Sequence, residues 1–525
     1  MCGQTVKVAG TILKSNMSKK SPWLQKIPLH SFLFAVYPGI ALLAFNISEV
    51  DLSSGFRPLL LSVLVAGFFM LVFYLIYRDW RRAALLATLL LVLFFSYGHV
   101  YILLKAVNLN GLYLFRHRTL TPIWFVLAAL MIWWASRRPL NITSATYGLN
   151  LIGLFLLILP VFQLVSFSIQ SRISQADAEK DASTLGLQAG SQPPDIYYII
   201  LDGYGRADVL ETQFGYDNSA FLNELQNLGF FVADCSQSNY AQTQMSLASS
   251  LNFNYIDALS DRFVAGSDDR TGLDALIHHS AARESLERAG YKTVAFATGF
   301  LATELTDADY FLSPGYSWGE LNEFEALLME TTFARLIQDG NRFGMQTSGS
   351  ERFRERTLFT LEKLDELSYI QGPKFVFVHV IAPHPPYVFG PTGGPIEPAE
   401  AGTTKTQEGA SHYRDQVIYI NSRMLEILPK IIASSSTPPI IVIQGDHGPT
   451  VHSSPRARMS NLNAYYLPDA NASVHPTITP VNTFRIIFNA YFGQNLELLD
   501  DASLYSEYDD PFNWRVVPNS CTTNE

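Results

Sequence analysis

The sequence predicts an N-terminal bundle of about five transmembrane helices, followed by an α/β domain with a mostly parallel central sheet covered by helices on both faces. Five long intervals without a charged residue in the first 170 residues predict the bundle. After residue 195, apolar runs alternate with helix-like segments, which predicts the α/β domain. Charge also separates the two parts, because residues 1–170 carry a net charge of +11 and the rest of the chain carries −21.

This composition excludes several classes of protein. Charge-free intervals of such length exclude a wholly soluble, a disordered and a collagen-like chain. The acidic second half argues against a nucleic-acid partner, because neutralising phosphates requires a concentrated basic face. The apolar intervals instead indicate the lipid bilayer as a partner.

The expected transmembrane helices lie between charged residues. About 20 apolar residues, rising roughly 1.5 Å each, cross a hydrocarbon core about 30 Å thick. We expect the five helices at residues 27–48, 58–77, 83–104, 119–136 and 145–168. A cleaved signal peptide is the alternative for the first, but four further spans follow it and no small-residue cleavage site is evident.

Positive charges predict the orientation of residues 1–170, the expected transmembrane domain. The segment before the first span and every second loop after it carry ten lysines and arginines, whereas the opposite loops carry four. The positive-inside rule therefore puts the N-terminus in the cytoplasm. Five crossings then place the C-terminal domain outside the cytoplasmic (inner or plasma) membrane.

A polar linker is expected at residues 171–194, which are rich in polar residues and proline and lack apolar periodicity. Residues 195–525 are long enough for one large domain with a substantial core. The chain has three cysteines, too few for a disulfide framework. Geometry decides whether Cys235 and Cys521 pair outside the membrane.

Strand-like and helix-like segments alternate in the second half. Residues 195–201 form a continuous apolar and aromatic run, typical of a strand buried on both faces. Further strands are expected at residues 230–233, 291–297, 374–381 and 439–444, and helices at 217–228, 281–289, 351–367 and 412–433. Repeated units of this kind predict a parallel sheet with helices on both faces.

Metal-capable side chains follow three of the expected strands. Asp202 follows the first strand, His384 follows the strand at 374–381, and Asp446 and His447 follow the strand at 439–444. Ligands bind at the carboxyl ends of parallel strands, so we expect these side chains at one edge of the sheet. Carboxylates with one imidazole suit a divalent cation. Each motif alone is more often a turn or a cap, and the prediction therefore depends on their joint placement.

Two other histidines carry weaker signals. His379 alternates with apolar residues within an expected strand, and we interpret it as a core histidine, with a position at the site as the lesser alternative. His452, five residues past His447, is a candidate for binding the substrate or a second ion. An exposed loop histidine is an equal alternative for it.

A hydroxyl-rich segment at residues 239–250 opens a helix and offers Thr243 and Ser246 as candidate nucleophiles. Helix capping and packing by small side chains would explain these residues without any chemistry. At a helix N-terminus, however, backbone N–H groups and the helix dipole stabilise an anion. A metal nearby would lower the pKa of the hydroxyl.

Taken together, these motifs resemble those of the alkaline phosphatase and sulfatase superfamily. A strand ending in Leu-Asp-Gly, a hydroxyl residue about 40 positions later, a Pro-His-Pro-Pro-Tyr segment and a Gly-Asp-His-Gly turn carry the resemblance. Five spans before an extracytoplasmic domain resemble the branch that contains lipoteichoic acid synthase and the lipid A phosphoethanolamine transferases.

The resemblance implies a role for each site residue. Thr243 would be the nucleophile and would also touch the metal, and its spacing from Ser246 is similar to that in the transferases. Asp202, Asp446 and His447 would complete the ligand set. His384 would contact the substrate phosphate or the leaving group. The implied cofactor is one or two divalent ions, with Mn, Zn, Mg and Ca all open.

Two departures from the sulfatases matter. Gln237 and Asn239 stand where formylglycine-dependent sulfatases have proline and arginine after the modified residue, so that chemistry is disfavoured. Gly203 follows Asp202 where those sulfatases have a second aspartate. A complete set of ligands for a second metal is therefore not recognisable.

The expected function is a membrane-anchored, metal-dependent phosphoryl-group transferase of the phosphoethanolamine or glycerophosphate type. It would act on a phospholipid, or on another phospho- or sulfo-ester, through a covalent intermediate on Thr243. The alternative is a sulfatase-like hydrolase, meaning a phosphatase, phosphodiesterase or sulfuric ester hydrolase. A catalytically silent membrane binding module is a further alternative, against which the joint presence of the four site residues argues.

Overall fold

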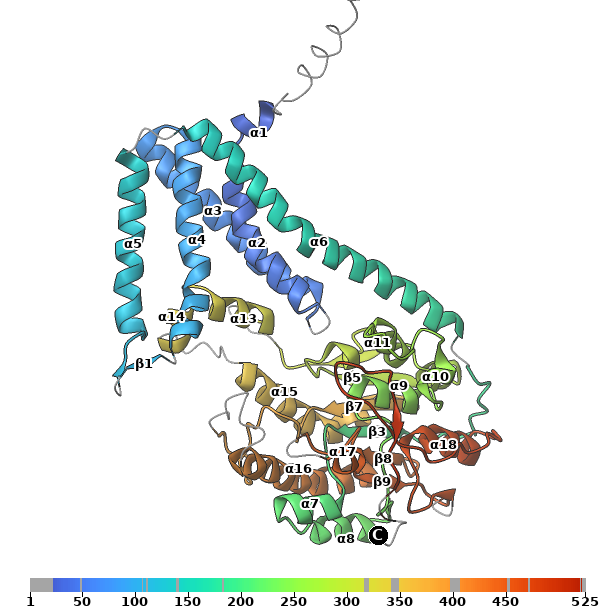
Figure 1. Ribbon diagram of the computed structural model, residues 1–525. Coiled ribbons are helices and arrows are strands. Elements are labelled where there is room, and N and C mark those ends of the chain that lie inside the picture. Colours follow the sequence, from blue (N-terminus) through green and yellow to red (C-terminus); the bar gives the residue numbers. More distant parts are fainter. Residues whose placement is uncertain are drawn as a thin grey trace, which may run out of the picture. The chain divides into compact units, whose positions relative to one another are not determined.

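The computed structural model describes residues 22–47, 50–105, 107–109, 112–137, 141–181, 184–315, 321–340, 349–396, 407–450, 454–470, 473–519 and 521. The chain divides into two compact units (Figure 1). The first unit comprises Met1–Ser166 together with Leu321–Thr347. The second comprises Phe167–Glu320 together with Ser348–Glu525.

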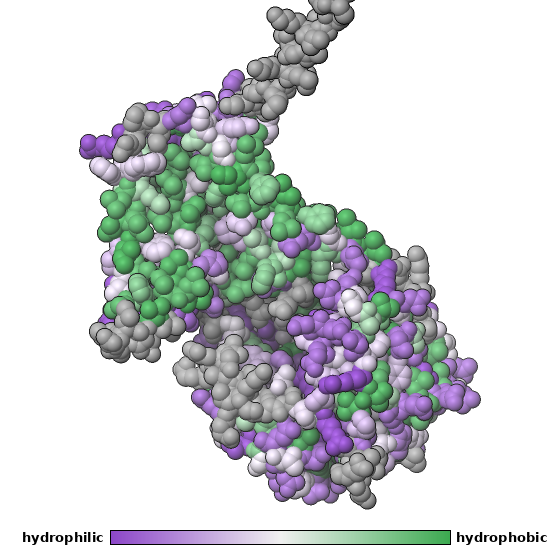
Figure 2. Space-filling view, in the orientation of Figure 1, coloured by the Kyte–Doolittle hydropathy of each residue, from purple (hydrophilic) through white to green (hydrophobic). Residues whose placement is uncertain are grey.

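Long apolar helices build the first unit, and they confirm the predicted bundle. They are α2 (His30–Phe45), α3 (Phe56–Tyr77), α4 (Trp80–Leu104), α5 (His117–Arg137) and, up to Ser166, α6 (Ile142–Asp181). The last four are long and apolar enough to cross a membrane, whereas α2, with 16 residues, is shorter than the predicted span. Hydrophobic side chains gather on the surface of these helices, as expected for a surface that faces lipid (Figure 2).

Two helices from the middle of the sequence join this first unit, which the sequence did not lead us to expect. They are α13 (Glu323–Thr331) and α14 (Arg335–Gly340). Phe324 and Leu328 pack against Leu43 of α2, and the backbone N–H of Phe333 donates to the carbonyl of Phe94 in α4 at 2.8 Å. The smaller elements of this unit are α1 (Pro22–Lys26), a 3-10 helix (Leu52–Gly55), and the hairpin of β1 (Asn108–Leu109) and β2 (Leu112–Tyr113).

Helix α6 continues through the first part of the segment that we expected to be a linker. It ends at Asp181, beyond the predicted end of the last span at residue 168. The reason is local: residues 171–181 are polar but include alanine, glutamate, glutamine and lysine, which favour helix, and contain neither glycine nor proline. Residues 184–195, which follow, contain no helix or strand.

A seven-stranded sheet forms the centre of the second unit, in the order β4-β9-β8-β3-β7-β5-β6. Its strands are β3 (Ile196–Leu201), β4 (Phe231–Val232), β5 (Lys292–Phe296), β6 (Tyr310–Leu312), β7 (Lys374–Val380), β8 (Ile440–Gln444) and β9 (Asn463–Tyr466). The strands from β8 to β6 pair in parallel, whereas β9 pairs antiparallel with β8 and with β4. The structure confirms the mostly parallel sheet.

Helices cover both faces of this sheet (Figure 1). They are α7 (Ala207–Phe214), α8 (Ser219–Asn227), α9 (Thr243–Leu251), α10 (Ile256–Leu259), α11 (Thr271–His278), α12 (Ala281–Arg288), α15 (Gly349–Lys363), α16 (Gln407–Ser434), α17 (Pro455–Met459) and α18 (Thr483–Tyr491). Short 3-10 helices lie at Leu301–Thr303, Leu364–Tyr369 and Pro480–Asn482, and β10 (Leu504–Tyr505) pairs with β11 (Arg515–Val516).

Residues of β3 alternate between the two hydrophobic cores that flank the sheet. Tyr197, Ile199 and Leu201 face one core, and Ile196, Tyr198 and Ile200 face the other. The continuous apolar run is thus explained by burial on both faces. Cys235 and Cys521 form a disulfide, with their Cα atoms 5.5 Å apart.

Candidate active site

The three central strands of the sheet deliver the candidate ligands to one edge. Strands β8, β3 and β7 are neighbours and run parallel, so their carboxyl ends lie together. Asp202 follows β3, Asp446 and His447 follow β8, and His384 follows β7. The backbone N–H of Asp202 donates to the carbonyl of Val380 at 2.9 Å, which holds this turn against β7.

Asp202, Asp446 and His447 form a compact buried group in which one ligand-capable atom of each lies within 4.8 Å of the others. His447 Nε2 lies 3.2 Å from Asp446 Oδ2 and 3.7 Å from Asp202 Oδ1. The other ring nitrogen, Nδ1, lies 2.8 Å from the carbonyl oxygen of Gly448, to which its N–H can donate. In that tautomer the lone pair of Nε2 faces the two carboxylates.

Two carboxylate oxygens in this group are buried without a hydrogen-bond partner in the described part of the chain. They are Asp202 Oδ1 and Asp446 Oδ2. The other oxygen of Asp446, Oδ1, accepts from the backbone N–H groups of Gly203 and His447, both at 2.9 Å. Burying unpaired carboxylate oxygens costs free energy, and a divalent cation would remove that cost. The residues therefore fit a metal centre of two carboxylates and one imidazole.

The charges of this group favour the forms that bind metal. Burial, reinforced by the guanidinium of Arg458, lowers the pKa of His447 to about 4. Burial would by itself raise the pKa of Asp202, but His384, His379 and His447 outweigh it and hold that pKa well below its usual range. At neutral pH the site therefore presents an ionised Asp202 beside a neutral His447.

Glycine makes the Gly-Asp-His-Gly turn sterically possible. A Cβ atom on Gly448 would lie 2.0 Å from the carbonyl oxygen of Ala457, and one on Gly445 would lie 2.5 Å from that of Tyr204. Neither backbone oxygen can move without displacing its own segment. The two glycines thus let the turn approach both neighbouring segments closely enough to present Asp446 and His447.

Thr243 begins α9 and faces the metal-binding group. Its Oγ1 lies 3.3 Å from His447 Nε2. In the described part of the chain, no side chain caps the N-terminus of α9, so the backbone N–H groups there can bind an anion. Ser246, by contrast, is buried and donates its hydroxyl to the backbone carbonyl of Asp446 at 2.6 Å. The Thr243 hydroxyl therefore faces the site, whereas the Ser246 hydroxyl holds the backbone of Asp446 in place.

His384 lies beside this group, and its ring centre is 6.5 Å from that of His447. Its Nδ1 lies 2.8 Å from the carbonyl oxygen of Pro385, an acceptor for Nδ1–H, which leaves Nε2 as the nitrogen for a substrate contact. His452, the other histidine for which we predicted a substrate contact, lies outside the described residues.

His379 lies closer to the site than its core position suggested. It is buried, as expected, and its Nε2 lies 3.4 Å from Asp202 Oδ2. Its Nδ1 lies 2.9 Å from the hydroxyl of Thr303. A histidine held in this way orients the carboxylate that it touches, a common arrangement around metal ligands.

Helix α16 supports two of the site loops through residues that sequence reasoning missed. The buried Tyr413 donates its hydroxyl to the carbonyl of Gly203 at 2.9 Å and accepts from the N–H of Gly205 at 3.0 Å. The amide of Gln416 donates to the carbonyl oxygens of Pro383 and His384, at 3.3 and 3.4 Å. Their three-residue spacing puts them on one face of α16, but only the structure shows what that face contacts.

Arg458 is another residue that the sequence did not single out. It belongs to the short helix α17, and its Nη2 lies 2.9 Å from His447 Nε2. A basic residue eleven positions after His447 is a weak signal, because arginines of short surface helices are common and usually solvated.

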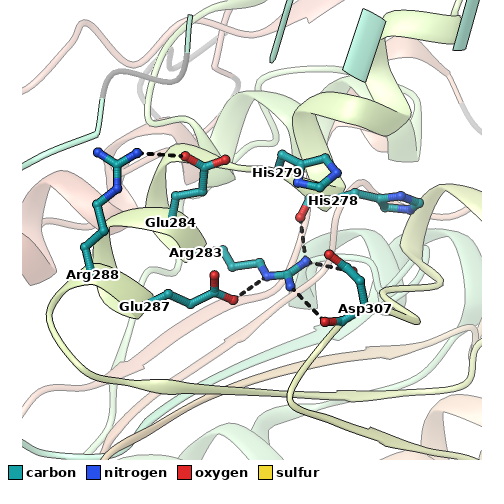
Figure 3. Close-up of a pocket in the computed structure, with 7 residues that line it drawn as sticks. All are labelled: His278, His279, Arg283, Glu284, Glu287, Arg288 and Asp307. Carbon is teal, nitrogen blue, oxygen red and sulfur yellow. Dashed lines mark hydrogen bonds and ion pairs between the residues drawn. The ribbon is translucent and has the colours of Figure 1, made fainter. Parts of the chain in front are cut away.

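A charged hollow of about 530 Å³ lies elsewhere in the second unit, and none of the candidate site residues lines it (Figure 3). Its centre is Arg283, which donates to Glu287 at 2.7 Å, to Asp307 at 3.0 Å and to the carbonyl of His278 at 2.7 Å. Two carboxylates thus neutralise the buried guanidinium. This arrangement is typical of a structural ion-pair cluster and offers no nucleophile.

Comparison with known proteins gives similar structures of low identity. No protein-family model and no curated protein matches the sequence. The C-terminal periplasmic domain of phosphoethanolamine transferase EptC from Campylobacter jejuni is 12% identical, with a TM-score of 0.38, and the match covers 63% of this chain and 97% of that one.

Two further structures are similar over different shares of the chain. For the integral membrane lipooligosaccharide phosphoethanolamine transferase A from Neisseria meningitidis, the identity is 12%, the TM-score is 0.31 and the coverage is 94% of both chains. The phosphonate monoester hydrolase of Agrobacterium radiobacter is 13% identical, with a TM-score of 0.37. The match covers 59% of this chain and 80% of that one. At such identities and TM-scores, we base the function on the geometry of the site.

Proposed function

We propose that the chain is a membrane-anchored phosphoryl-group transferase of the phosphoethanolamine or glycerophosphate type, with Thr243 as nucleophile and its active site outside the cytoplasmic membrane. One observation carries the proposal: the Thr243 hydroxyl lies 3.3 Å from Nε2 of His447, beside the unpartnered oxygens of Asp202 and Asp446. A nucleophile at a helix N-terminus next to a three-residue metal site is suited to attack on a phosphorus centre.

In the first half of the reaction, the transferred group moves to the enzyme. A divalent cation bound by Asp202, Asp446 and His447 would lower the pKa of the Thr243 hydroxyl and offset negative charge on the phosphoryl oxygens. Thr243 Oγ1 forms a bond to phosphorus as the bond from phosphorus to the donor's oxygen breaks. The donor alcohol leaves with the proton that Thr243 gives up, and His384 Nε2 is placed to contact the leaving oxygen.

In the second half, the group moves from Thr243 to an acceptor. An acceptor hydroxyl attacks phosphorus, the bond to Thr243 Oγ1 breaks, and the threonine regains its proton. Backbone N–H groups at the start of α9 and the helix dipole stabilise the negative charge on the group while it is held there. Attack by water instead of an acceptor would make the same site a hydrolase.

The first unit supports a lipid as the donor. Helices α2, α4 and α6, with the end of α13, line a mostly apolar groove of about 610 Å³. Tyr37, Ser96, His99 and Thr331 are the lining residues with polar groups on their side chains, and Phe34, Phe95 and Leu156 are typical of the rest. Acyl chains are the molecules that surround transmembrane helices, so we assign this groove to one chain of a phospholipid.

Filling the groove tests that assignment. Ala41→Phe adds an aromatic ring to the groove wall and is expected to raise KM for a long-chain phospholipid donor. The turnover of a water-soluble aryl phosphodiester should remain unchanged. Equal losses with both donors would contradict a role for the groove in binding the lipid.

The proposed function itself is tested with the full chain in vesicles that contain a phospholipid labelled in its headgroup. A transferase moves the label to an acceptor lipid and releases diacylglycerol, whereas a hydrolase releases the label to water. Thr243→Ala should abolish both outcomes, and Ser246→Ala, the matched hydroxyl deletion one helical turn away, should retain activity. Vesicles in which no label moves, with or without added Zn²⁺ or Mn²⁺, would favour the silent binding module.

A further inference from the structure

Arg458 joins the nucleophile loop to the metal-binding turn. Its Nε donates to the carbonyl of Ala241, two residues before Thr243, at 2.8 Å. Its Nη1 donates to the carbonyl of Gly448, next to His447, at 3.3 Å. These two hydrogen bonds fix the plane of the guanidinium, so the position of its remaining nitrogen is set by the backbone on both sides.

The remaining nitrogen, Nη2, points at the centre of the candidate active site. It lies 2.9 Å from His447 Nε2, the same atom that Thr243 Oγ1 approaches to 3.3 Å and Asp446 Oδ2 to 3.2 Å. A positive charge, a hydroxyl nucleophile and the metal-ligand atoms therefore converge on one point. The oxygens of a group attached to Thr243 would lie beside this atom.

Arg458 is half-buried, and its surroundings differ from those of the buried Arg283. Among the described residues, no carboxylate forms an ion pair with it, in contrast to Arg283, which has two. The charges of Asp446 and Asp202 act on it, but the buried oxygens Asp446 Oδ2 and Asp202 Oδ1 make no hydrogen bond to it. A fixed guanidinium without a carboxylate partner, beside a nucleophile, is suited to an oxyanion.

We propose that Arg458 binds a non-bridging oxygen of the phosphoryl group while that group is attached to Thr243. The inference rests on the proposed function and adds a substrate-binding residue to it. No step of the transfer is assigned to Arg458 beyond this contact, because its Nε and Nη1 already hold the two loops. The competing view is that Arg458 only clamps those loops.

The test measures binding of inorganic phosphate by calorimetry to the full chain in detergent, loaded with Zn²⁺ or Mn²⁺. Charge-assisted hydrogen bonds of this kind predict that Arg458→Met weakens phosphate binding about 10- to 100-fold. Metal content by elemental analysis should stay that of the wild type, because Arg458 is not a ligand. Arg456→Met, an exposed arginine on the same helix, is the matched control and should bind phosphate as the wild type does.

Arg458→Gln covers the case in which the methionine variant fails to fold, because its amide can still donate to the carbonyl of Ala241 without carrying charge. Weakened phosphate binding with retained metal supports the inference. Wild-type phosphate affinity in either folded variant, or loss of the metal together with phosphate, overturns it in favour of a clamp. A wild-type chain that binds neither metal nor phosphate contradicts the proposed function instead, so the two failures are distinguishable.

Discussion

Replacing Asp274 by asparagine is expected to stabilise the second unit at neutral pH and to flatten the pH dependence of its stability. Asp274 lies in α11, and its Oδ1 accepts from the amide of Gln244, the neighbour of Thr243, at 2.7 Å. Asparagine keeps this acceptor oxygen and nearly the same shape. It removes only the charge, so the change in stability reports the cost of ionising the group where it stands.

Burial raises the pKa of Asp274 to about 6 from 3.8, although the hydrogen bond from Gln244 acts in the opposite direction. The folded state therefore holds this proton more tightly than the unfolded state. Stability then falls as pH rises from about 4 to about 6, and the loss is complete above that range. Two pKa units correspond to about 3 kcal/mol, and partial solvent access reduces the expected cost to about 1 to 2 kcal/mol.

The assay is urea unfolding of the full chain in detergent at pH 4 and pH 8, followed by near-ultraviolet circular dichroism. Asp274→Asn should exceed the wild type in stability by about 1 to 2 kcal/mol at pH 8 and by much less at pH 4. Asp257→Asn, which removes an exposed carboxylate in the same unit, should change stability by less than about 0.5 kcal/mol. An Asp274→Asn protein less stable than the wild type at pH 8 would refute the reasoning.

Three further predictions follow from the site and the disulfide. Asp446→Asn removes the charge of a ligand, and elemental analysis should find at least tenfold less bound Zn²⁺ or Mn²⁺ than in the wild type; undiminished metal would place the ion elsewhere. Ser246→Ala loses the 2.6 Å hydrogen bond to the carbonyl of Asp446 and should lower stability by about 1 to 3 kcal/mol in urea unfolding, while labelling of Thr243 by the donor persists. Cys235→Ser frees Cys521, which should then react with a membrane-impermeant maleimide on intact cells; protection in cells combined with reaction after lysis would put this domain in the cytoplasm.

The pattern of apolar residues predicted the part of the fold that positions the site. Strands β3, β7 and β8 are continuous apolar runs, and their ends carry the ligand-capable residues at the point where parallel strands place them together. Strand β9 was missed because its four residues, Asn-Ala-Tyr-Tyr, are too short and too polar to show periodicity. Its antiparallel pairing with β8 depends on tertiary contacts that no local pattern encodes.

Residues that support the site through contacts distant in sequence could not be predicted from the sequence. Tyr413 and Gln416 look like ordinary residues of a long helix, and their hydrogen bonds reach loops at least 28 and as many as 210 positions away in sequence. The hydrogen bond from Arg458 to Ala241 depends on the position of α17 in the fold, which the sequence of α17 does not determine. The packing of α13 in the first unit could not be predicted from its local sequence either. Its capping box indicates where the helix begins but not which helices it contacts.

The central claim, that Thr243 carries the transferred group, is tested most directly by intact-mass spectrometry of the full chain after incubation with a phospholipid donor and Zn²⁺ or Mn²⁺. We predict an added mass equal to the phosphorylated headgroup less one water, located on Thr243 by fragmentation and absent from Thr243→Ala or when a chelator removes the metal before the incubation. An adduct on any other residue, or donor turnover that continues in Thr243→Ala, would contradict the account.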